Sequence, residues 1–87
     1  MNGFTVTWDD DARDELARLW LVNTKVRREV TVAADEIDRL LSVRPLELGV
    51  ETAPHTRQYV EPPLKVLFKV SEGDRLVRVL YVKFWYD

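Results

Sequence analysis

Residues 64–86 read LKVLFKVSEGDRLVRVLYVKFWY, and this stretch decides the fold. Residues 64–70 alternate between apolar side chains on one side and mainly lysines on the other, a period of two that is typical of a β-strand with one buried face. Residues 71–74 are polar and contain Gly73, whose freedom to adopt a positive φ suits a short hairpin loop. The stretch therefore predicts an antiparallel β-hairpin.

The second half of this hairpin carries apolar side chains on both sides of the alternation. One side has Leu76, Leu80, Val82 and Phe84, and the other has Val77, Val79, Tyr81 and Trp85. A strand that is apolar on both sides is typical of a central strand that is covered twice. We therefore expect it to form the core of the domain, with Leu80 buried.

The upstream sequence predicts the elements that cover this hairpin. Residues 4–8 alternate as a short strand, and the aspartates at 9–11 are expected to cap a helix whose apolar positions are 12, 16, 19 and 20. A second helical pattern covers residues 25–42, after a break at Asn23-Thr24 that supplies a second cap. Two helices joined so closely form an α-helical hairpin.

Residues 43–56 are predicted to be irregular because prolines and a glycine punctuate them, and residues 56–60 are predicted to form a further strand. The order of strand, two helices and then strands predicts an α+β fold. We expect a single domain over residues 1–87, in which the helical hairpin packs on one face of an antiparallel sheet.

Composition limits the classes of protein to consider. The chain has 87 residues, of which 46% are hydrophobic and 32% charged, as in one small folded domain. It has no cysteine and a single histidine, His55, which we interpret as a solvated loop residue. We therefore expect no disulfide, metal site or cofactor. It also lacks a signal peptide pattern and an apolar run of roughly 18 residues, which predicts a cytoplasmic protein without a membrane segment.

Charge is unevenly distributed along the chain. Residues 1–54 carry seven basic residues against eleven acidic ones, whereas residues 55–87 carry six against four. The basic residues of the second part are Arg57, Lys65, Lys69, Arg75, Arg78 and Lys83. On an open sheet face they can bind phosphate oxygens, and the rings of Tyr59, Tyr81, Trp85 and Tyr86 can stack on bases. The alternative is that the lysines protect strand edges against aggregation and the rings lie in the core.

Several features together resemble the RelE/ParE superfamily of bacterial toxins. They are a first strand ending in Val6-Thr7-Trp8, an acidic helix start with Ala12 and Leu16, the helical hairpin, Pro45 and Gly49 after it, and the closing pattern LKVLFKVSEGDRLVRVLYVKFW. Lys65 stands where the family usually has arginine, and Phe68 where it usually has tyrosine. The resemblance covers nearly the whole chain.

The resemblance implies the toxin component of a type II toxin–antitoxin module, which stabilises plasmids or controls growth and is neutralised by a cognate antitoxin. Its relatives are ribosome-dependent mRNA endoribonucleases or non-enzymatic DNA gyrase inhibitors, and a third alternative is an inert member that only binds its antitoxin. The net charge of −2, and Phe84-Trp85 where a His-Arg pair is common, favour the last two.

For the nuclease alternative, the resemblance implies roles for particular residues. Lys65 and Arg78 would stabilise charge on the phosphate, and Tyr86 would transfer a proton if cations lowered the pKa of its phenol. Arg57, Lys69 and Lys83 are expected to bind the target.

Overall fold

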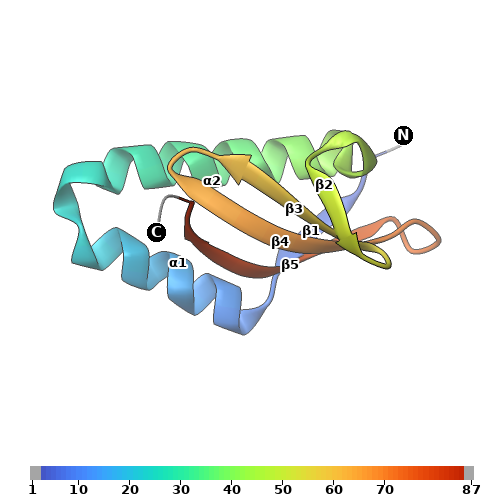
Figure 1. Cartoon of the computed structure of the whole chain (residues 1–87), viewed down its shortest axis with the longest axis horizontal. Helices are drawn as coiled ribbons and strands as arrows, with labels where there is room; N and C mark the ends of the chain where they lie inside the picture. The colour runs from blue at the N-terminus through green and yellow to red at the C-terminus, as the bar shows by residue number, and fades with distance from the viewer. Residues whose placement is uncertain (1–2, 86–87) are drawn as a thin grey trace.

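The computed structural model describes residues 3–85, which form a layer of helices on one face of a five-stranded sheet (Figure 1). The helices are α1 (Asp10–Val22) and α2 (Arg27–Val43), with short 3-10 helices η1 (Thr24–Val26) and η2 (Pro45–Glu47). The strands are β1 (Thr5–Trp8), β2 (Val50–Ala53), β3 (Thr56–Glu61), β4 (Leu64–Ser71) and β5 (Leu76–Phe84). The predicted α+β class, the helical hairpin and the C-terminal β-hairpin are confirmed.

The strand order is β1-β5-β4-β3-β2, so β5 is an inner strand, as predicted. β1 pairs with β5 in parallel, whereas the other pairs are antiparallel, so the expectation of an entirely antiparallel sheet is wrong. The helical hairpin returns the chain to the beginning of β1, where Phe4 N donates to Ser42 O at 2.8 Å. Three hairpins reverse the chain between β2 and β5, so β5 runs opposite to β2, and β1, which is parallel to β5, also runs opposite to β2.

The core lies between the helices and one face of the sheet. Every second residue of β4 from Leu64 to Val70 is buried, as the alternation predicted. The buried residues of the helices are Ala12 and Leu19 in α1 and Val30, Ala33, Ile37, Leu40 and Leu41 in α2. The α2 set follows a spacing of three and four, so one face of this helix packs on the sheet.

β5 changes its buried side in the middle of the strand. In its first half Val77 and Val79 are fully buried, whereas in its second half Val82 and Phe84 are buried. These two pairs have opposite parity in the sequence, so a regular strand would point them to opposite faces. An irregularity between them brings all four side chains to the core.

The pairing of β4 with β5 locates this irregularity. Phe68 lies opposite Val79, but the neighbouring Leu67 lies opposite Tyr81, so Leu80 is an extra residue on β5. One unpaired residue of this kind is a β-bulge. The expectation that β5 is covered on both faces, with Leu80 in the core, is therefore wrong. Leu80 is only partly buried. The buried apolar residues of β5 occupy odd positions before the bulge and even positions after it, which made the strand look apolar on both faces.

The loop between β4 and β5 differs from the prediction in one detail. Gly73 was expected to supply the positive φ, but the residue with a positive φ is Arg75, at 53°. Arg75 is the last residue before β5, and its N donates to Glu72 O at 3.2 Å. Its guanidinium lies 4.0 Å from the centre of the Phe4 ring, which ties the loop to the start of β1.

The segment predicted to be irregular contains the edge strand β2. All four of its residues are exposed, so no apolar alternation marks it in the sequence. Gly49, just before it, has a φ of 67°, and a Cβ there would lie 1.9 Å from Gln58 O. A glycine is therefore required where this segment approaches β3.

The bulge predicts different costs for two leucines on adjacent strands. Leu64→Ala removes a fully buried side chain and should lower the free energy of unfolding by about 2–5 kcal/mol, whereas Leu80→Ala should cost less than about 2 kcal/mol. Denaturant unfolding of both variants measures the difference. Equal losses would contradict the position of the bulge.

Candidate functional site

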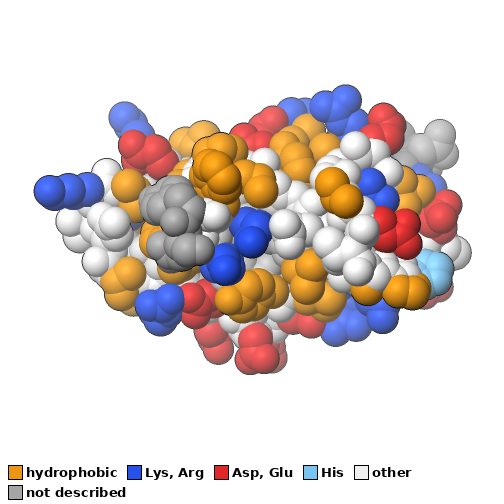
Figure 2. Space-filling model, in the orientation of Figure 1, with side chains coloured by type: hydrophobic (Ala, Val, Ile, Leu, Met, Phe, Trp, Pro, Cys, Tyr) orange, Lys and Arg blue, Asp and Glu red, His pale blue; other side chains and the backbone are white. Residues whose placement is uncertain are grey.

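The face of the sheet opposite the helices is open. Leu64, Val66 and Phe68 of β4 point toward the helices, so Lys65 and Lys69 point the other way. Figure 2 shows basic side chains over the middle of the molecule, where Figure 1 places β4 and β5. The expectation that Lys65 and Lys69 share a face is confirmed.

Cations on β4 lie opposite cations on β5. Lys65 is the partner of Lys83, and Lys69 is the partner of Arg78. Directly opposed side chains have Cβ atoms about 4.5–5.5 Å apart, and like charges in such a pair are destabilising. Within residues 3–85 none of the three lysines forms an ion pair. These four residues, named here the basic face, form a surface suited to an anion with several charged groups.

A shallow hollow of about 120 Å³ lies at one end of the basic face. Lys65 and Lys83 line it together with Gln58 of β3 and Tyr81 of β5. Tyr81 is 51% exposed, so its ring is available for stacking. Gln58 adds an amide that can donate and accept hydrogen bonds. The hollow thus combines two ammonium groups, a ring and an amide.

Arg78 differs from the three lysines because its charge is already engaged. Its Nε and Nη2 atoms lie 3.1 and 2.8 Å from the two carboxylate oxygens of Asp9, a two-bond ion pair. The hydrogen bonds that Arg78 donates to the Asp9 carboxylate raise the pKa of Arg78. Asp9 occupies the N-cap position of α1, as predicted, but its side chain makes no capping hydrogen bond. Its carboxylate binds Arg78 instead.

Arg57 lies apart from the basic face. It is opposite Phe68, a residue that points to the helices, so its side chain is on the helical side of the sheet. Its Nε and Nη2 atoms donate to Leu48 O at 2.8 Å and Gly49 O at 3.2 Å. The structure therefore uses Arg57 to hold the segment before β2 and does not bring it together with the other predicted target-binding residues.

The phenol predicted to transfer a proton, Tyr86, lies outside the described residues. Tyr59 is on the helical side of the sheet, where its OH donates to Glu61 Oε1 at 2.7 Å. Burial, together with the Glu61 carboxylate, raises the pKa of Tyr59 to about 12, so it is not a base at neutral pH.

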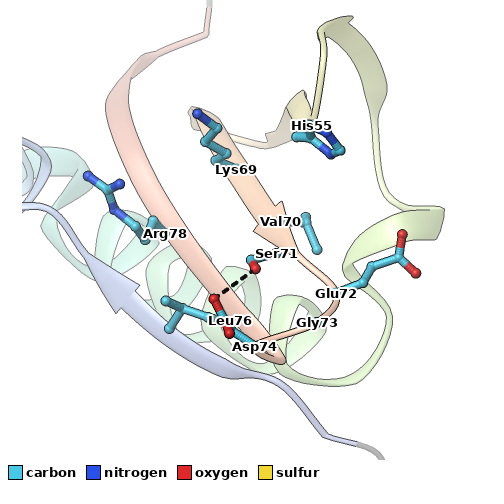
Figure 3. A pocket seen from close by; sticks show the side chains of 9 residues that line it. All are labelled: His55, Lys69, Val70, Ser71, Glu72, Gly73, Asp74, Leu76 and Arg78. Carbon is cyan, nitrogen blue, oxygen red and sulfur yellow. Dashed lines mark hydrogen bonds between the residues drawn. The ribbon is translucent and has the colours of Figure 1, made fainter.

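A larger hollow, of about 550 Å³, lies at the other end of the basic face. Lys69 and Arg78 line it with His55, which stands in the β2–β3 turn with a φ of 61° (Figure 3). Two acids also border it, Glu72 and Asp74, and Asp74 accepts a hydrogen bond from Ser71 Oγ at 3.2 Å. This end is therefore less purely basic than the end that holds Lys65 and Lys83.

A second candidate surface lies between the helices. It is a mainly apolar groove of about 490 Å³, named here the helical groove, lined by Arg13, Leu16, Ala17, Trp20, Leu21, Val30, Thr31, Ala34 and Asp35. Leu21 is 63% exposed. Trp20 is fixed by a hydrogen bond from its Nε1 to Thr31 Oγ1 at 3.1 Å and by the Arg27 guanidinium 4.0 Å from its ring centre. A fixed aromatic beside exposed aliphatic side chains is typical of a protein-binding surface.

Residues 3–85 contain no group of three or more His, Cys, Asp or Glu side chains that could hold a metal ion. None of the helices that the structure describes is long and apolar enough to cross a bilayer.

Sequence reasoning missed two contributors to the open face. Gln58 lies beside Lys65 and Lys83, and Asp9 holds Arg78, although neither was a candidate. A strand prediction for residues 56–60 could have found Gln58, because its position alternates with that of Arg57. The Asp9 contact joins residues 69 positions apart and has no local signal.

No family model matches the sequence, and no curated protein matches it either. Solved structures do match. A chain of the toxin–antitoxin complex RelBE2 from Mycobacterium tuberculosis is similar with a TM-score of 0.80 and 20% identity, covering 100% of this chain and 97% of that one. A chain of the chromosomal ParDE toxin–antitoxin system from P. aeruginosa follows at 0.74 and 17% identity, covering 97% and 98%.

The isolated E. coli RelE toxin is similar with a TM-score of 0.60 and 16% identity, covering 93% of this chain and 83% of that one. These three matches cover 93% or more of this chain and 83% or more of each solved chain. They confirm the expected RelE/ParE-like fold.

The environment of Tyr59 predicts its alkaline titration. Because folding raises its pKa from 10.0 to about 12, the neutral phenol contributes stability that is fully present below pH 10 and is lost as the pH rises toward 12. Phenolate absorbance followed against pH should show one group that ionises late, and this group should be missing in Tyr59→Phe. A wild-type curve without a late group would contradict the assignment.

Proposed function

We propose that this chain, which has the fold shared by RelE and ParE toxins, is the toxin component of a type II toxin–antitoxin module. The observation that carries the proposal is the full-length match to a chain of a toxin–antitoxin complex at a TM-score of 0.80. Two surfaces of this chain support it independently. They are the helical groove, which suits a protein partner, and the basic face, which suits a charged target.

The helical groove is the proposed site of the antitoxin. Its apolar floor suits one face of an amphipathic helix, which would fold on contact with it. Arg13 and Asp35 stand among the lining residues, so acidic and basic groups flanking the apolar face of the partner would find partners of opposite charge. An apolar groove with both signs of charge at hand favours a folded peptide helix over a small molecule.

The basic face is the proposed contact with the cellular target. Lys65, Lys69 and Lys83 supply positive charge, and Tyr81 supplies a ring beside them. This combination fits a phosphate-bearing strand such as messenger RNA in the ribosome, where the lysines would also stabilise charge that develops on a phosphate.

A second candidate function is inhibition of a target such as DNA gyrase without bond cleavage. It is favoured by the lining of the hollow at Lys65 and Lys83, which within residues 3–85 includes no carboxylate or histidine to act as a base. Purified protein added to translating ribosomes and to a gyrase supercoiling reaction separates the two functions. Cleaved messenger RNA supports the first, and blocked supercoiling with intact RNA supports the second.

The like-charge pairs predict that function and stability respond in opposite directions. A Lys65→Gln, Lys83→Gln variant should lose growth arrest when it is induced without antitoxin, because the anion-binding charges are gone. Its free energy of unfolding should stay equal or rise by about 0.2–1 kcal/mol, since a repulsive cross-strand pair is removed. Lys25→Gln, an exposed lysine on η1, is the matched control. Full growth arrest by the folded double variant would contradict the proposed target surface.

The helical groove predicts a selective effect on antitoxin binding. Leu21→Glu places a charge on the exposed apolar lining of the groove and should abolish or strongly weaken the complex with the product of the adjacent reading frame, measured by calorimetry and co-purification. Val32→Glu changes an equally exposed residue of α2 that does not line the groove, and should bind normally. Equal binding by both variants would show that the antitoxin binds outside the helical groove. If the wild-type protein does not bind, the proposal of a toxin–antitoxin module is contradicted.

A further inference from the structure

The side chain of Asp9 connects the start of α1 to Arg78 of the basic face. Its backbone is fixed on both sides, because its N donates to Val79 O and its O accepts from Arg13 N, each at 2.9 Å. Its carboxylate makes no capping bond to the helix and is directed to Arg78. The side chain can therefore leave Arg78 without any break in the backbone pairing of β1 or α1.

The Asp9 carboxylate binds Arg78 as an anionic ligand would. Both of its oxygens face the guanidinium, in the two-bond geometry that arginine also offers to a phosphate group. The two side chains are 30% and 50% exposed, so solvent and solutes reach the pair. An exposed pair of this kind contributes little net free energy and is open to competition.

Release of Arg78 would change the charge of the basic face. Arg78 stands opposite Lys69, and both line the larger hollow. Figure 3 shows the guanidinium turned out of this hollow, away from His55 and Lys69. While Asp9 is paired with Arg78, Lys69 is the one uncompensated cation of the Lys69–Arg78 pair. When the Asp9 carboxylate leaves, both cations are uncompensated.

We infer that Asp9 occupies, within the same chain, an oxyanion site that Arg78 can offer to a phosphate group of a polyanion, with Lys69 as the neighbouring cation across the strand pair. The inference rests on the proposed role of the basic face in target binding. Asp9 thus weakens anion binding at the Lys69–Arg78 end of the basic face relative to the Lys65–Lys83 end. A phosphate that enters the site displaces the carboxylate and takes over its two hydrogen bonds.

The test is the binding of a fluorescent single-stranded oligothymidylate, followed by anisotropy over a range of salt concentrations. Asp9→Asn keeps the shape of the side chain and removes its charge. Glu15→Gln is the matched control, because it removes the same charge from α1 and also breaks an ion pair, with Arg18, that is not part of the basic face. Thermal melting verifies that both variants fold.

Asp9→Asn should bind several-fold more tightly than Glu15→Gln, and its log–log salt slope should steepen by about 0.7, as expected for one more phosphate contact on a single strand. Arg78→Gln added to Asp9→Asn should remove the gain. Equal affinity and slope for Asp9→Asn and Glu15→Gln would overturn the inference.

A second measurement uses the unmodified protein, so the test does not depend on the folding of a variant. The Nε–H resonance of Arg78 should shift when the oligonucleotide is added, because its acceptor changes, and an unchanged resonance in the bound protein would also overturn the inference. The double variant Lys65→Gln, Lys83→Gln shows whether only the role of Asp9 fails or whether polyanion binding by the basic face fails as well. If it lowers the affinity while Asp9→Asn behaves as its control, only the role of Asp9 fails. If no protein binds, the basic face fails as a polyanion site as well.

Discussion

The one-residue mismatch between β4 and β5 is the constraint on which both faces of the sheet depend. On the helical side it lets Val77, Val79, Val82 and Phe84 all reach the core, although their spacing along the chain is irregular. On the open side it brings Arg78 and Lys83 to the same face, although they are an odd number of residues apart. A bulge is therefore the device that sorts apolar and basic side chains on β5.

The cations sorted in this way stand opposite further cations on β4. Such an arrangement opposes folding slightly, and the compact apolar core on the other side of the same strands offsets it. Hydrophobic burial thus fixes the positions of charges that would otherwise move apart. Surfaces whose charges are held near one another by a rigid sheet are pre-organised for an anionic partner, because little ordering remains to be done when the partner binds.

Periodicity predicted the helical hairpin, the alternation of β4 and the inner position of β5, because these features follow from local burial. It did not predict the parallel pairing of β1, the exposed strand β2 or the bulge at Leu80. The parallel pairing of β1 with β5 depends on the direction in which β2 enters the sheet, which no local pattern sets. β2 has no buried face, and one inserted residue changes parity without a change in composition.

The candidate site was predicted in part. Lys65 and Lys69 were placed on one face by alternation, and Lys83 and Arg78 join them there. Arg57 was misplaced, because its side chain is bound by backbone carbonyls on the opposite side of the sheet. Tyr86 lies outside the described residues, and its role remains a prediction. Contacts between distant segments, such as Asp9 with Arg78, follow from the folded arrangement and have no local signal in the sequence.

The helical groove and the basic face lie on opposite sides of a single sheet, which limits how one partner can influence both. A helix confined to the groove leaves the basic face open, so a complex of three components is sterically allowed. Complete coverage requires a chain that continues past an edge of the sheet, along β1 or β2, at roughly 3.3 Å per extended residue. The length of such a continuation therefore decides whether binding in the groove also masks the charged surface or merely tethers a partner beside it.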